Sequence, residues 1–119
     1  MSTEWSEDIV VVDLDDEPAL SEELSSVIDR VNEALDGDAS GGGHVPHVVL
    51  NLGGVSYINS SNLADLLRLR KALTAKGRQM RLCSLRDEVW QVMMVTGLDK
   101  VLVFAPDPLT ALAGLQMAE

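Results

Sequence analysis

Four small polar residues in a row, Asn59-Ser60-Ser61-Asn62, stand where the chain passes from an extended segment into a leucine-rich helical pattern. They carry two hydroxyls and two amides, and a serine hydroxyl is a group that protein kinases esterify with phosphate. A helix that begins here points free backbone N–H groups and the positive end of its dipole at these residues, and both favour an anion. The stretch predicts a serine whose phosphate, with roughly two negative charges, changes which partner docks.

The same residues also suit ordinary helix capping, because a Ser or Asn side-chain oxygen can accept a hydrogen bond from the first helical turn. Either Asn59 or Ser60 fits that role, which contributes about 1 kcal/mol. One cap requires only one such residue. Capping alone therefore leaves the rest of this stretch unexplained, and we expect the two hydroxyls to face solvent and the backbone to be accessible.

The rest of the chain lacks the residue patterns that catalysis or nucleotide binding requires. Neither glycine-rich phosphate-binding loop occurs, and no Gly-x-Ser-x-Gly nucleophile turn is present. His44 and His47 lie three residues apart with no cysteine or acid nearby, so we predict no metal site and no cofactor. The sequence indicates a binding or switching module and not an enzyme.

Length and charge restrict the fold and the partners. With 119 residues the chain suits one domain, 1–119, and it has neither a membrane-spanning apolar stretch nor a secretory leader, which favours the cytoplasm. Its net charge is −10, with thirteen acids and one base in residues 1–38 but six acids and eight bases in residues 39–119. An acidic surface repels phosphates, so we expect neither nucleic acid nor bare membrane as a partner.

Apolar periodicity predicts strands and helices that alternate along the chain. Strands are predicted over 9–14, 47–52, 79–85 and 100–105. Helices are predicted over 15–35, 61–76, 86–97 and 107–117. Residues 1–7 are expected to be a flexible N-terminus, and 37–46 a flexible loop. This order predicts an α/β fold with a four- to five-stranded, mostly parallel sheet and about four helices, which either cover both faces or lie on one.

Between Val45 and Leu112, four segments follow the pattern of one family in order: "VVLNL", "INSSNLADLL", "AKGRQMRLCSL" and "VTGLDKVLVF". Together they resemble the STAS domain of bacterial anti-sigma factor antagonists. The resemblance implies partner switching, in which a serine kinase that doubles as the anti-sigma factor phosphorylates the antagonist and a phosphatase resets it. It places the phosphate on Ser60, with its neighbour Ser61 as the alternative.

The resemblance also implies a partner-binding surface around the phosphorylated serine. It comprises the residues Asn59, Ser60, Ser61, Asn62, Asp65 and Arg68. A homodimer is left open. A second hypothesis is a STAS subunit that does not switch and belongs to a larger assembly, such as a stressosome-like shell or a lipid-transport complex.

Three asparagines depart from the family's pattern. Asn59 replaces the motif aspartate, Asn62 the motif glycine, and Asn51 the aspartate at the strand end. The changes at Asn59 and Asn62 favour the scaffold hypothesis slightly. The family also forms two strands before its first helix, and we expect little room here for the second of them.

Overall fold

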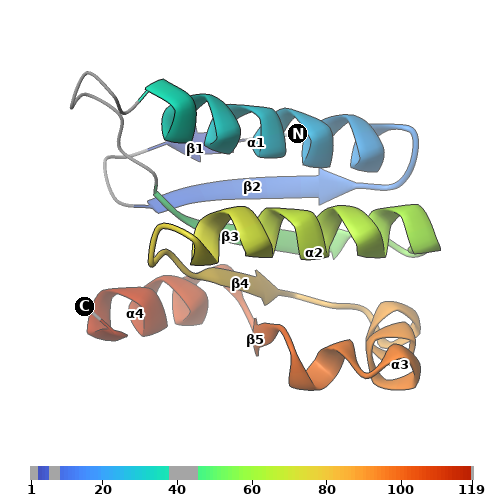
Figure 1. Cartoon of the computed structure of the whole chain (residues 1–119). Helices are drawn as coiled ribbons and strands as arrows, with labels where there is room; N and C mark the ends of the chain where they lie inside the picture. The colour runs from blue at the N-terminus through green and yellow to red at the C-terminus, as the bar shows by residue number, and fades with distance from the viewer. Residues whose placement is uncertain (1–2, 6–8, 38–45, 119) are drawn as a thin grey trace.

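The computed structural model describes residues 3–5, 9–37 and 46–118, which form five strands and four α-helices (Figure 1). The strands are β1 (Thr3–Trp5), β2 (Ile9–Asp15), β3 (His47–Gly54), β4 (Met80–Cys83) and β5 (Val103–Ala105). The helices are α1 (Ala19–Gly37), α2 (Ser60–Thr74), α3 (Asp87–Thr96), the short 3-10 helix η2 (Leu98–Lys100) and α4 (Pro108–Ala118).

The five strands form one sheet in the order β1-β2-β3-β4-β5. β1 is antiparallel to β2, and each of the other neighbouring pairs is parallel. The predicted α/β fold with a mostly parallel sheet is therefore confirmed. Because β2 and β3 are parallel neighbours, the loop that follows β2 lies beside the loop that leads from β3 into α2.

Helices cover both faces of this sheet, which settles a point that the sequence left open. Val48 and Leu50 of β3 lie in the large core cluster with the apolar residues of α1 and α2, whereas Val49 packs with Ala111 and Leu115 of α4. Because successive side chains of a strand point to opposite faces, α1 and α2 cover one face and α4 covers the other. The nearly continuous apolar sequence of β3 reflects this two-sided burial.

The prediction that residues 1–7 form a flexible terminus is wrong over Thr3–Trp5. These residues form β1 and pair with β2 in a register that places Thr3 opposite Val12 and Trp5 opposite Val10. Three residues are too few to show strand periodicity, so only the pairing with β2 reveals them. The predicted 37–46 loop falls mostly outside the described residues, apart from Gly37 at the end of α1 and Pro46 before β3.

The later elements follow the predicted boundaries with one exception. β5 begins at Val103 and not at residue 100, because residues 98–100 form the turn of η2. Gly97 ends α3 in the left-handed region, at φ 79°. The carboxylate of Asp107 accepts a hydrogen bond at 2.7 Å from the backbone N–H of Thr110 and thereby caps α4.

None of the described helices combines the length and the apolar composition that a bilayer crossing requires. Likewise, no three His, Cys, Asp or Glu side chains in the described part of the chain gather closely enough to hold a metal ion.

Gly54, at the end of β3, lies against the end of β2. A Cβ atom added there would stand 2.8 Å from the backbone oxygen of Leu14 and 2.5 Å from Oδ1 of Asp15. The Asp15 side chain can rotate away, but the Leu14 carbonyl belongs to a buried strand. Any larger residue at position 54 must therefore push the two strand ends apart.

We predict that Gly54→Ala lowers the free energy of unfolding by about 2 kcal/mol, because the added methyl overpacks this contact. Urea denaturation measures the effect. Gly114→Ala is the matched control: its Cβ would lie 4.0 Å from the Arg81 side chain, in ordinary contact, and alanine favours the α4 helix. Equal or greater stability of Gly54→Ala would contradict the close approach.

Candidate functional site

Ser60 is the first residue of α2, immediately after the N-cap residue Asn59. The short segment 55–59 connects β3 to α2, so Ser60 lies at the carboxyl end of the parallel strands. Ser60 and Ser61 are both exposed, and neither hydroxyl has a hydrogen-bond partner among the residues that the structure describes. Both hydroxyls are accessible to another protein.

Asn59, and not Ser60, caps the helix. Its Oδ1 accepts a hydrogen bond from the backbone N–H of Asn62 at 2.8 Å, and Oδ1 of Asn62 accepts one from the backbone N–H of Asn59 at 3.0 Å. This reciprocal pair is a capping box. It leaves the Ser60 side chain free of any capping role.

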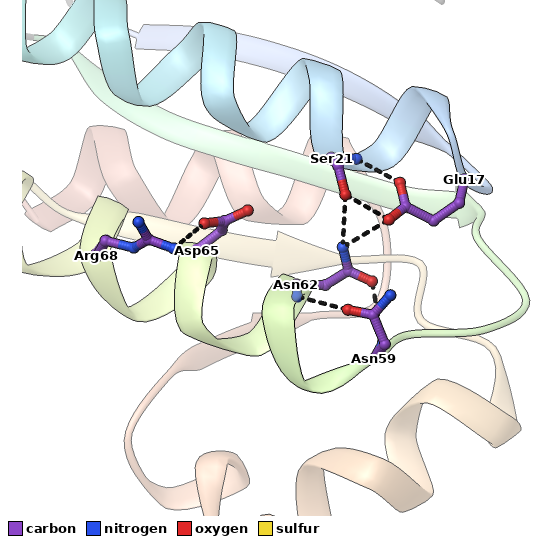
Figure 2. A network of polar contacts seen from close by, with 6 residues as sticks. All are labelled: Glu17, Ser21, Asn59, Asn62, Asp65 and Arg68. Carbon is purple, nitrogen blue, oxygen red and sulfur yellow. Dashed lines mark hydrogen bonds and ion pairs between the residues drawn. The ribbon is translucent and has the colours of Figure 1, made fainter.

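Asn62, which the family resemblance places among the partner-binding residues, is fully buried. Its amide nitrogen donates to Glu17 Oε2 at 3.3 Å and to Ser21 Oγ at 3.4 Å, across to the start of α1 (Figure 2). Both amide hydrogens and the amide oxygen therefore have partners, as a buried amide requires. Because it is buried, Asn62 cannot touch a docking protein directly. The four residues joined by these hydrogen bonds are called the Asn62 network: Glu17, Ser21, Asn59 and Asn62.

Within the Asn62 network, Glu17 is held as a carboxylate. The Ser21 hydroxyl donates to Glu17 Oε2, and the Ser21 backbone N–H donates to Oε1 at 2.6 Å. These two bonds, with smaller contributions from the amides of Asn62 and Asn59, hold the pKa of Glu17 below its usual value of 4.5. Glu17 belongs to the loop between β2 and α1, so this carboxylate fastens that loop to α1 and α2.

Asp16 makes a second connection between the two loops. Its carboxylate accepts hydrogen bonds from the backbone N–H and the hydroxyl of Ser56, both at 2.8 Å, and from the backbone N–H of Tyr57 at 3.3 Å. The bonds from Ser56 lower the pKa of Asp16 most, with smaller contributions from Tyr57 and the charge of Arg86. Asp16 thereby orders the segment that leads into Ser60.

Asn51 ties β3 to β2 just before these loops. Its amide nitrogen donates to Asp13 Oδ1 at 2.9 Å, and its amide oxygen accepts from the backbone N–H of Gly53 at 3.1 Å. A carboxylate at position 51 has no hydrogen to donate and would repel Asp13. The amide suits this pairing better than the aspartate of the family's pattern does.

Asp65 and Arg68 lie on α2 beyond the first turn and form an ion pair 2.5 Å apart. Arg68 is 66% exposed, whereas the Asp65 side chain is only 13% exposed. The structure therefore places Arg68 among the accessible residues near Ser60, and it leaves Asp65 mainly as the partner that orients Arg68.

The family model of the STAS domain matches residues 2–111. The chain belongs to the STAS domain family. An anti-sigma F factor antagonist from Paenibacillus polymyxa is 28% identical over 71 residues, which make up 60% of this chain. The match spans 61% of that curated relative's length.

Solved structures of STAS proteins share the fold at low sequence identity. A protein described as an anti-sigma factor antagonist from Thermotoga maritima superposes with a TM-score of 0.76 at 18% identity, over 97% of this chain and 93% of that one. The phosphorylated form of the Bacillus protein SpoIIAA superposes with a TM-score of 0.61 at 18% sequence identity, over 89% of this chain and 91% of that one. A chain from a stressosome structure superposes with a TM-score of 0.67 at 17% sequence identity, over 98% of this chain and 97% of that one.

The departures of this STAS domain from the family's pattern have local physical explanations. Asn59 caps α2 as an aspartate would, and Asn62 fills the third helical position, where no unusual backbone angle calls for glycine. The bond from Asn51 to Asp13 and the bonds from Asn62 to Glu17 and Ser21 need amide donors, which an aspartate or glycine side chain lacks.

Sequence reasoning missed five residues of this site: Asp16, Glu17, Ser21, Ser56 and Tyr57. Asp16 and Glu17 lie in an acidic stretch that solvation alone would explain, but the parallel pairing of β2 and β3 brings it beside the segment that enters α2. That adjacency is the signal that would have found the two acids. Tyr57 is 65% exposed, three residues before Ser60, and it enlarges the accessible surface.

We predict that Asn62→Ala lowers the free energy of unfolding by about 2 kcal/mol, because it leaves partly buried groups of Asn59 and Ser21 without their partners. Urea denaturation of the purified chain measures this. Ser61→Ala, which changes an exposed neighbour, is expected to stay within about 0.5 kcal/mol of the parent. Equal stability of the two variants would contradict the role of the Asn62 network.

The lowered pKa of Glu17 predicts how stability depends on pH. Its carboxylate is favoured in the folded chain, so it adds stability above the ordinary value of 4.5, and this stability is lost as pH falls through the lowered folded value. Carbon-detected NMR titration should find the pKa of Glu17 below 4.5 and closer to it in Ser21→Ala, which removes the largest cause. An unchanged Glu17 titration in Ser21→Ala would contradict the assignment.

Proposed function

We propose that this STAS domain is an anti-sigma factor antagonist, a cytoplasmic binding module whose contact with a serine kinase is switched by phosphorylation of Ser60. The kinase doubles as the anti-sigma factor, and a phosphatase resets the switch. One observation carries the proposal: the Ser60 hydroxyl is exposed at the first position of α2 and has no hydrogen-bond partner among the described residues. The name of the Paenibacillus polymyxa relative and the likeness to phosphorylated SpoIIAA support it.

The first turn of α2 suits a phosphate on Ser60. Asn59 already occupies the backbone N–H of Asn62, while those of Ser60 and Ser61 have no partner within the described chain. A phosphate on Ser60 gains these two donors and the positive end of the dipole of a 15-residue helix. The Asn62 network lies on the buried side of the turn, so phosphorylation does not have to break it.

The charges around Ser60 explain why a phosphate changes docking. Asp16 and Glu17 are held as carboxylates in the adjoining loop, so the surface already carries negative charge before phosphorylation. A phosphate adds roughly two further negative charges and three acceptor oxygens. A partner that tolerates the unmodified surface then meets a bulkier and more strongly anionic one, which weakens its binding.

The proposed docking surface combines exposed residues from the loop and from α2. Tyr57 presents an aromatic ring, Ser60 and Ser61 present hydroxyls, and Arg68 presents a cation. Tyrosine and arginine are the side chains most often found at the energetic centre of an interface. Asn59 lies at the edge of this surface, and Asn62 acts beneath it by holding α2 in place.

We predict that the kinase transfers one phosphate to the parent chain and to Ser61→Ala, and none to Ser60→Ala, because the resemblance to the family's pattern places the acceptor at Ser60. Incubation of the full chain with its kinase and ATP, followed by intact mass measurement and peptide mapping, checks this. Ser60→Glu should also bind the kinase about tenfold more weakly than Ser60→Ala, since it adds a negative charge.

The control variants separate the outcomes. Phosphate retained on Ser60→Ala and lost from Ser61→Ala would move the acceptor to Ser61. Absence of phosphate from every variant, with kinase activity verified on another substrate, would remove the switch.

The scaffold hypothesis loses part of its support in the structure. The departure from the family's pattern at Asn62 favours the scaffold hypothesis when only the sequence is considered. The hydrogen bonds of Asn62 to Glu17 and Ser21 give this residue a structural role that requires no larger assembly. Light scattering distinguishes the two hypotheses, because a simple antagonist gives a monomer or dimer whereas a shell subunit gives a large particle.

A further inference from the structure

A groove of about 200 Å³ lies at the end of the sheet opposite to Ser60. Its walls come from the C-terminal half of α2, from the amino end of β4 and from the segment that enters β5. The residues that give it its chemical character are Arg70, Thr74, Arg78, Arg81, Val101 and Val103. The strands are parallel and α2 runs back along them, so this groove and Ser60 lie at opposite ends of α2.

The groove is strongly basic in an acidic chain. It contains three arginines and is lined by no aspartate or glutamate, although the whole chain has a net charge of −10. Arg70 and Arg81 form no ion pair with any residue of the described chain. Arg81 lies on the face of the sheet that α4 covers, where its side chain approaches Gly114 and burial lowers its pKa. An anionic ligand would supply the missing partner.

The groove also follows a free edge of the sheet. β5 is the last strand and pairs only with β4, through the register Arg81 to Val103, so one side of its backbone has no strand partner among the described elements. Val101 is 40% exposed and Val103 is 48% exposed beside the arginines. An extended peptide can add to such an edge and place its alternate side chains against these apolar and basic residues.

From this combination we propose that the β5 edge and its arginine groove form a docking site for an extended, acidic peptide segment of a protein partner. Nucleic acid and anionic bilayers fit less well, because their phosphates continue well beyond the groove and would meet the acidic part of the chain. A short peptide is confined to the groove, so its carboxylates meet the arginines and not the acidic part of the chain.

The site is independent of the phosphorylation switch. Residues 60 and 74 stand at opposite ends of α2, about 20 Å apart at 1.5 Å per residue. A peptide in the groove therefore leaves the Ser60 surface open to a second protein. Failure of the phosphorylation proposal would leave this one untouched, because Ser60→Ala is expected to bind the peptide as the parent does.

The test is an NMR titration of the full ¹⁵N-labelled chain with the capped peptide Ac-Glu-Val-Glu-Val-Glu-NH₂. Saturable shifts are expected at the backbone amides of Arg78–Arg81 and Val101–Ala105, and much smaller ones with the matched peptide in which Gln replaces Glu. Arg70→Gln should weaken binding about fivefold, whereas Lys71→Gln, its exposed neighbour outside the groove, should change it little. Arg81→Gln should weaken binding more than Arg70→Gln does. If Arg81→Gln does not fold, Arg70→Gln alone tests the proposal.

Several results would overturn the proposal. These are no shifts at millimolar peptide, equal shifts with the Gln peptide, or shifts centred on Ser60. Inorganic phosphate that reproduces the same shifts would reduce the groove to a small-anion site. Concentration-dependent shifts at these residues without peptide would place the acidic surface of a second copy of the chain there instead.

Discussion

The hydrogen bonds of the Asn62 amide are the contact on which the geometry of this site depends. Asn62 is the only described residue of the Asn59–Asn62 stretch that is fully buried, and it joins the start of α2 to Glu17 and Ser21. Without it, the hydrogen bonds between the two loops in the described chain would be mainly those that Asp16 accepts from Ser56 and Tyr57. A buried amide with every hydrogen bonded permits one arrangement, which fixes where Ser60 points.

This arrangement assigns different tasks to adjacent residues. Asn59 and Asn62 satisfy the helix start, so Ser60 and Ser61 are left exposed with their hydroxyls unused in the described chain. Had a serine been the cap, its hydroxyl would have been engaged with backbone N–H groups and less accessible to another protein. The amides of Asn59 and Asn62 thus satisfy the helix start and allow the hydroxyls of Ser60 and Ser61 to face outward.

Much of the fold was predictable because its elements are long and periodic. The mostly parallel pairing of the strands follows from the alternation of strand and helix patterns along the chain, whereas the covering of both faces of the sheet was left open. β1 was not predictable, because a three-residue strand is defined by its partner alone. Nor were the inward orientation of Asn62 and the bonds of Asp16, since both depend on which loops the sheet brings together.

Helix α2 connects the Ser60 surface to the arginine groove, and the charged side chains near its two ends have opposite signs. Its amino end offers free N–H groups beside two carboxylates, so an anion there is both attracted by the helix and repelled by Asp16 and Glu17. Its last two turns present Arg70 toward a groove that holds no acid. An anionic group therefore meets opposing forces at Ser60 and favourable ones at the groove. The phosphate that we propose on Ser60 would be covalent and so would stay in place beside these carboxylates, whereas a reversibly bound carboxylate is favoured where no acid lines the site.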